Sequence, residues 1–185
     1  MKKNSSLWAV IPFFISLFSY WIVLSWLDRT LFLFSVREKL DGSFFHNLLA
    51  TIQAGYKLDF SLAGYLLVLP FLFFIIQLIF IKKEVSKWWL RGYVMVPTFL
   101  FAAFSAINIP LYQSWNEKIS KRAIQMAAET PEGLMASVDW AIIGTVVLML
   151  GIYFLCAHYF YHGVVVQFAK YVKLSLMQII MVFLV

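Results

Sequence analysis

Long apolar runs dominate this chain, and their length indicates the elements more clearly than any periodicity does. The runs cover 7–27, 60–81, 93–110, 139–161 and 172–185. An uninterrupted apolar stretch of about 18 residues or more is typical of a transmembrane helix. The first four runs reach that length, whereas the fifth stops short of it at Val185. We therefore expect an all-α integral membrane protein with four complete transmembrane helices and the beginning of a fifth.

Charged residues between the runs indicate how the helices are oriented. Lys2 and Lys3 precede the first run, and a basic turn from Lys82 to Arg91, opposed by a single acid, follows the second. Short segments rich in lysine and arginine stay in the cytoplasm. The pattern predicts a cytoplasmic N-terminus, with the segments 28–59 and 111–138 on the outer side.

Both outer segments are expected to contain interfacial helices. The segment 28–59 carries balanced charges and too many apolar residues for a free loop, which favours an amphipathic helix lying in the headgroup region. In the second outer segment, residues 119–128 could form a short helix.

Two polar residues mark the expected start of the second helix. Asp59 and Ser61 stand where an N-cap belongs, with side chains that could accept hydrogen bonds from unpaired backbone N–H groups. Pro70 lies in the middle of the same run and removes one backbone donor. We expect a kink there, supported by a neighbouring helix or a water.

Composition agrees with a membrane protein and excludes several other classes. Hydrophobic residues make up 63% of the chain and charged residues 13%, about half the roughly 25% of an average soluble domain. The net charge of +6 arises from basic clusters beside apolar runs, which indicates topology and not binding to nucleic acid. The single cysteine, Cys156, can form no intramolecular disulfide.

Candidates for chemistry are few. No ionisable side chain falls within 7–27, 60–81, 93–109 or 140–156, which argues against transport of protons or ions. His158 and His162 are four residues apart and could ligate zinc or haem, but no third ligand lies nearby. Interfacial polar residues are the simpler interpretation, and a haem-binding membrane subunit is an alternative that absorbance would test. No catalytic motif occurs in this chain.

One outer patch combines basic and aromatic residues just beyond the third run. Lysine and arginine beside aromatic rings at a membrane surface could hold a lipid phosphate. The simpler interpretation is a solvated helix face with interfacial aromatic residues. The candidate lipid-binding residues are Tyr112, Trp115, Lys118, Lys121 and Arg122.

Two stretches resemble a known family. The residues Gly55 to Tyr65, GYKLDFSLAGY, follow the pattern G-x-x-x-D-x-S-x-x-x-Y, and a Tyr-x-x-Trp, Pro-Glu and Ala-Ser series runs from Tyr112 to Ser137. Together they resemble the membrane part of lipoteichoic acid synthase-like proteins, the phosphoglycerol transferase and sulfatase family, and in particular its Bacteroidetes-type members.

The resemblance implies a membrane anchor domain. Family members have five transmembrane helices, a cytoplasmic N-terminus and an external catalytic domain with a threonine nucleophile and a divalent metal. That domain has no counterpart in this chain, so the resemblance implies no catalytic residue and no cofactor here, and a fragment that is inactive alone. The expected location is the bacterial cytoplasmic membrane, and the expected partner is membrane lipid, an anionic phospholipid donor among the candidates.

A second class of function is a self-contained membrane scaffold without catalysis. Gly144 and Gly151 lie two turns apart in the fourth run, a spacing that suits close helix contact and could bind a partner subunit. Neither the oligomeric state nor an enzymatic activity follows from the sequence.

Overall fold

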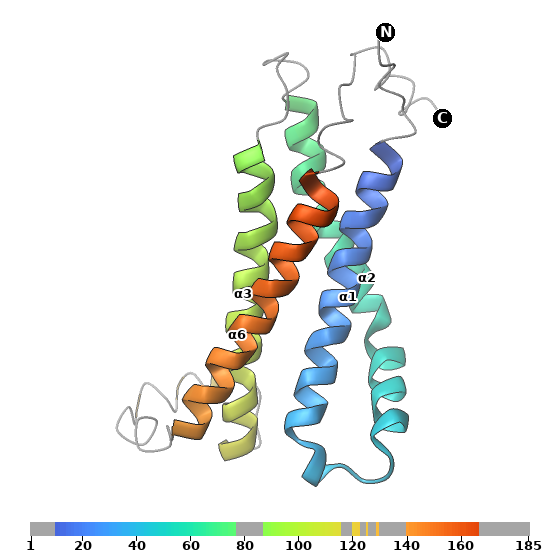
Figure 1. Cartoon of the computed structure of the whole chain (residues 1–185). Helices are drawn as coiled ribbons and strands as arrows, with labels where there is room; N and C mark the ends of the chain where they lie inside the picture. Colours follow the sequence, from blue (N-terminus) through green and yellow to red (C-terminus); the bar gives the residue numbers. More distant parts are fainter. Residues whose placement is uncertain are drawn as a thin grey trace, which may run out of the picture.

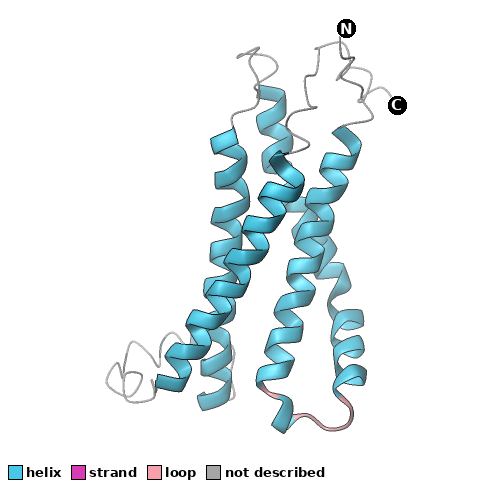
Figure 2. Ribbon diagram, in the orientation of Figure 1, coloured by secondary structure: helices cyan, strands magenta, loops and turns pink. Residues whose placement is uncertain are grey.

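The computed structural model describes residues 10–76, 87–115, 120–122, 125, 129 and 140–166. Its long helices are α1 (Val10–Ser35), α2 (Phe44–Ile76), α3 (Lys87–Trp115) and α6 (Trp140–Phe160), with the short 3₁₀ helix η2 (Arg37–Lys39) after α1 and the π-helical turn η4 (Tyr161–Val165) after α6 (Figures 1 and 2). Each long helix contains a segment long and apolar enough to cross a membrane, so 4 candidate spans are present. The expected all-helical, multi-pass fold is confirmed to that extent.

The interfacial helix predicted for the segment 28–59 is not confirmed, because η2 is the only separate helix that the structure describes there. Residues 28–35 continue α1, and residues 44–59 form the first part of α2. A charged residue need not end a membrane helix when its charge is matched on a neighbouring helix, as described below. The predicted fifth helix at 172–185 lies outside the described residues, as does most of 119–128.

The N-cap of α2 is Ser43, not Asp59 or Ser61. Ser43 Oγ accepts the backbone N–H of His46 at 3.3 Å, directly after Gly42, whose φ of 84° turns the chain into the helix. Ser61 lies well inside α2, where its hydroxyl donates to the carbonyl of Lys57 at 2.9 Å. The cap prediction was wrong because the helix begins at Phe44.

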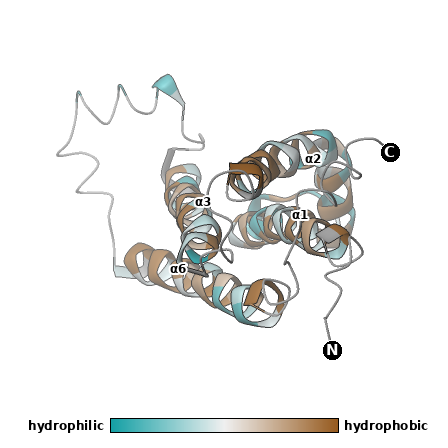
Figure 3. Cartoon of the chain, turned by 90° about the horizontal axis from the view of Figure 1, so that it is seen from above, coloured by the Kyte–Doolittle hydropathy of each residue, from teal (hydrophilic) through white to brown (hydrophobic). Residues whose placement is uncertain are grey.

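The helices pack as two pairs, α1 with α2 and α3 with α6 (Figures 1 and 3). Buried residues from all four helices form one core, among them Leu17, Trp21, Ala63, Val94 and Tyr153. Tyr20 on α1 joins the pairs, because its ring stacks on Phe160 with centroids 4.1 Å apart and its hydroxyl lies 2.6 Å from Thr98 Oγ1. In Figure 1, α1 and α6 approach at the upper end and separate toward the α1–α2 connection.

A neighbouring helix supplies the donor that Pro70 lacks. In a regular helix the carbonyl of Leu66 would accept the N–H of residue 70, which proline does not have. The hydroxyl of Tyr93 on α3 donates to that carbonyl at 2.9 Å, and Trp21 Nε1 donates to the same hydroxyl at 3.0 Å. The expected support for Pro70 is thus confirmed, and α2 continues through it to Ile76.

The glycines of α6 do not mediate close packing within the described chain. Gly144 and Gly151 are exposed, and a Cβ atom at either position would meet nothing within 4 Å. In a membrane this face of α6 contacts lipid or another protein.

Candidate functional site

Five charged residues of the described chain lie inside the candidate membrane spans, and two of them are Lys57 on α2 and Arg91 on α3. The other three lie close together. Asp28 and Arg29 belong to the span Ile11–Ser35 of α1, and Asp59 belongs to the span Phe44–Phe73 of α2. The predicted runs ended at residue 27 and began at residue 60, so they excluded these groups. The argument against ion transport from a lack of ionisable groups therefore does not hold. Ionisable residues inside a membrane domain are expensive to bury and commonly mark a functional site.

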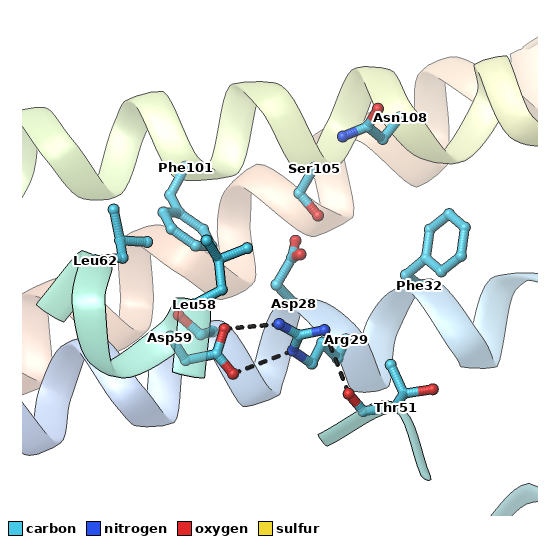
Figure 4. A pocket seen from close by; sticks show the side chains of 11 residues that line it. Asp28, Arg29, Phe32, Thr51, Leu58, Asp59, Leu62, Phe101, Ser105 and Asn108 are labelled. Carbon is cyan, nitrogen blue, oxygen red and sulfur yellow. Dashed lines mark hydrogen bonds and ion pairs between the residues drawn. The ribbon is translucent and has the colours of Figure 1, made fainter. Parts of the chain in front are cut away.

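Arg29 and Asp59 form a two-pronged ion pair (Figure 4). Arg29 Nη2 lies 2.7 Å from Asp59 Oδ1, and Arg29 Nε lies 3.2 Å from Asp59 Oδ2. The guanidinium also reaches the backbone carbonyls of Thr51 and Gly55, each at 3.5 Å. The side chain of Asp59 is only 5% exposed, so its charge depends on Arg29 for compensation.

Gly55 is required for this arrangement. A Cβ atom at position 55 would collide with the guanidinium of Arg29. Thr51, Gly55 and Asp59 are spaced four residues apart, which places them on one face of α2 beside Arg29. Two residues of the family-like motif, Gly55 and Asp59, therefore form the binding position of the arginine.

Asp28 belongs to a second hydrogen-bonded group that joins three helices. Tyr153 Oη on α6 lies 2.8 Å from Asp28 Oδ1 and 3.3 Å from Ser105 Oγ on α3. A phenol has one proton, and the carboxylate is the nearer and stronger acceptor. Ser105 Oγ is a second, more distant acceptor for the same hydroxyl.

A cavity of about 300 Å³ lies between α1, α2 and α3 around these groups (Figure 4). In Figure 4, Asp28 and Ser105 point toward each other from α1 and α3. Apolar side chains complete the walls. The described lining residues are Ser25, Asp28, Arg29, Phe32, Thr51, Leu58, Asp59, Leu62, Phe101, Ser105 and Asn108.

The lining is rich in acceptors and carries a net negative charge. Two carboxylates and one guanidinium line the cavity, which leaves one negative charge uncompensated. The hydroxyl protons of Ser25 and Thr51 are donated to the carbonyls of Trp21 and Asn47, at 3.0 and 2.7 Å. These oxygens therefore offer lone pairs to a ligand. The arrangement suits binding of a hydrogen-bond donor.

Of the predicted outer lipid patch, the structure describes the side chains of Tyr112, Lys121 and Arg122. Tyr112 packs against Phe32 with ring centroids 5.1 Å apart and lies 5.6 Å from Lys39 Nζ. Lys121 and Arg122 are exposed. Lys118 and the side chain of Trp115 lie outside the described residues, so lipid binding by this patch stays a prediction.

The two histidines near the end of α6 are neighbours. The rings of His158 and His162 have centroids 4.6 Å apart. Within the described ranges, no group of three or more His, Cys, Asp or Glu residues could hold a metal ion.

Sequence reasoning missed the roles of Arg29, Asp28, Ser105 and Tyr153. One local signal in the sequence could have indicated the binding position of Arg29. Thr51, Gly55 and Asp59 are four residues apart, which places them on one face of a helix. That signal required α2 to begin before residue 51. The contacts of Tyr153 with Asp28 and Ser105 join distant parts of the chain, so no local sequence pattern predicts them.

Comparison of the chain with protein-family models, with curated proteins and with solved structures found no match.

Proposed function

We propose that this chain is the membrane domain of a phosphoglycerol transferase- or sulfatase-like enzyme, and that its cavity receives the headgroup of a phospholipid donor. The domain anchors the enzyme at the outer face of the bacterial cytoplasmic membrane and is inactive alone. One observation carries the proposal: Arg29 and Asp59 line a polar cavity inside the candidate spans, and Gly55 leaves room for the arginine. Gly55 and Asp59 also belong to the motif that carries the family resemblance.

The position of the cavity supports a lipid ligand. Asp28, Arg29 and Phe32 lie toward the Ser35 end of α1, the end that the charge pattern places outside. A volume of about 300 Å³ is at the lower end of the usual range for ligand sites and suits a headgroup better than a whole lipid. Leu58 lines the cavity and is 71% exposed, so acyl chains could pass it and remain in the bilayer.

The anchoring role is tested by reading the source gene beyond the codon for Val185. We expect an open frame that encodes a phosphatase-like domain with a threonine nucleophile and metal-binding His and Asp residues. A stop codon at that point, followed by unrelated sequence, would contradict the anchoring role.

Headgroup binding is tested by mass spectrometry of the phospholipid that remains with the purified chain. Ser105→Leu fills the cavity with an apolar side chain, and we expect this variant to retain less phospholipid than the wild type. Ser61→Leu is the matched control, because Ser61 is exposed on α2 and does not line the cavity. Equal retention by both variants would contradict the cavity as the lipid site.

A further inference from the structure

We propose that the cavity binds a primary ammonium group, with Asp28 as its counter-charge. The group could belong to the headgroup of a zwitterionic phospholipid or to a free amine. The inference deepens the proposed function by naming the chemical group that the cavity recognises. It rests on the proposed function only where it assigns the ammonium group to a lipid.

The charges around the cavity favour a cation. Arg29 is matched by Asp59 through two short contacts, so it does not compensate Asp28. Among the described residues, Asp28 has one polar partner, the neutral hydroxyl of Tyr153. A carboxylate inside a membrane domain is unfavourable unless a positive charge accompanies it or a proton neutralises it. A cationic ligand fulfils the first condition.

The hydrogen-bonding groups select the kind of cation. The second oxygen of Asp28 and the hydroxyl oxygens of Ser25 and Ser105 line the same cavity, and the hydroxyl proton of Ser25 is donated to the carbonyl of Trp21. A primary ammonium has three N–H donors and no acceptor, which complements such a lining. A quaternary ammonium has no N–H to donate.

An anionic group at this position is disfavoured. A phosphate beside Asp28 would meet a like charge, and the guanidinium of Arg29 is already held by Asp59. The inference therefore differs from the anionic phospholipid donor that the family resemblance implies.

The test compares lipids that differ only in the headgroup, using the purified chain in detergent and native mass spectrometry. We expect phosphatidylethanolamine to bind about tenfold more tightly than phosphatidylcholine or phosphatidylglycerol with the same acyl chains. In Asp28→Asn, binding of phosphatidylethanolamine should weaken about 10- to 100-fold. Glu38→Gln is the control, because Glu38 is exposed and outside the cavity, and should bind like the wild type.

A second variant and a soluble amine test the role of the Asp28 carboxylate independently. Tyr153→Phe leaves the Asp28 carboxylate in place but removes its hydrogen bond, and should change phosphatidylethanolamine affinity less than Asp28→Asn does. Ethanolammonium chloride should raise the unfolding temperature of the wild type more than sodium chloride at equal concentration. An equal effect of sodium would overturn the ammonium assignment.

The outcomes separate this inference from the proposed function. Tight binding of phosphatidylglycerol that does not depend on Asp28 would overturn the ammonium assignment and leave headgroup binding intact. Stabilisation by ethanolammonium that depends on Asp28, without binding of any phospholipid, would support the assignment and contradict the lipid as its source. Absence of both effects would contradict both proposals.

Discussion

At the scale of single residues, Arg29 is the group on which the polar interior depends. Its guanidinium contacts both carboxylate oxygens of Asp59 and two backbone carbonyls of α2. Such a pair contributes little net stability compared with apolar packing, but removal of one partner leaves a buried charge without compensation. The pair is therefore a sensitive point for mutation.

Replacement of either member of this pair alone should be strongly destabilising. We expect Arg29→Gln or Asp59→Asn to lower the free energy of unfolding by about 3–5 kcal/mol, because each replacement breaks a buried ion pair. The double variant Arg29→Met/Asp59→Leu should recover part of that loss. Thermal unfolding can be followed with a thiol-reactive dye on Cys156, the single cysteine. The exposed Glu38→Gln is the control, and single variants as stable as this control would refute the prediction.

Gly55 provides a second residue-scale prediction. Gly55→Ala should destabilise the protein by about 1–3 kcal/mol, because the added methyl group displaces the guanidinium of Arg29 from Asp59. Gly64→Ala in the same helix is the matched control, since its Cβ atom would meet nothing within 4 Å. Alanine favours a helix interior over glycine by roughly 0.5–1 kcal/mol, so Gly64→Ala should be neutral or stabilising. Similar unfolding temperatures for the two variants would show that the Arg29–Asp59 ion pair forms without a glycine at position 55.

At the scale of elements, α2 contains a proline whose missing hydrogen bond is replaced from α3. Tyr93 Oη donates to the Leu66 carbonyl that residue 70 would otherwise bind. Inside a membrane, water does not readily satisfy such a carbonyl, so a polar side chain on a neighbouring helix takes that role. The contact fixes α2 against α3 at this level.

A double-mutant cycle tests that contact. We expect Tyr93→Phe to destabilise the wild type by about 1 kcal/mol more than it destabilises a Pro70→Ala background. In that background the new alanine supplies a backbone N–H that can bond the Leu66 carbonyl, so the tyrosine hydroxyl is no longer needed there. The loss of the Trp21 contact occurs in both backgrounds and cancels. Equal destabilisation in both would mean that Tyr93 does not replace the missing donor.

At the scale of the whole molecule, the two helix pairs are joined at two levels along α1. Stacking of Tyr20 on Phe160 joins the pairs in the N-terminal half of α1. The link from Asp28 through Tyr153 to Ser105 joins them further along α1, beside the cavity. The polar residues thus line a cavity between the pairs and do not face lipid.

The orientation of the whole molecule is a further prediction. Basic residues beside the first two spans indicate that the N-terminus is cytoplasmic and the α1–α2 connection external. In a Cys156→Ala background, Ser43→Cys should react with a membrane-impermeant maleimide in intact spheroplasts. Ser86→Cys should react only after lysis. The reverse labelling pattern would overturn the assigned orientation and place the cavity toward the cytoplasm.

The sequence alone determined the membrane class of the chain and the four long helices, because apolar length is a local property. It also indicated that Pro70 needs a donor from a neighbour, since a proline lacks its N–H in any context. It did not determine where the helices end, because the apolar pattern predicts boundaries at Asp28 and Asp59, and both residues lie inside a helix.

Only the tertiary structure decided what those charges do. A charged residue ends a membrane span or lies inside it depending on whether another helix neutralises or hydrogen-bonds it. Asp59 has Arg29 as its partner on α1, and Asp28 has Tyr153 on α6. These partners are distant along the chain. Their contacts and the cavity that they line therefore depend on how the helices pack, which no local sequence pattern predicts.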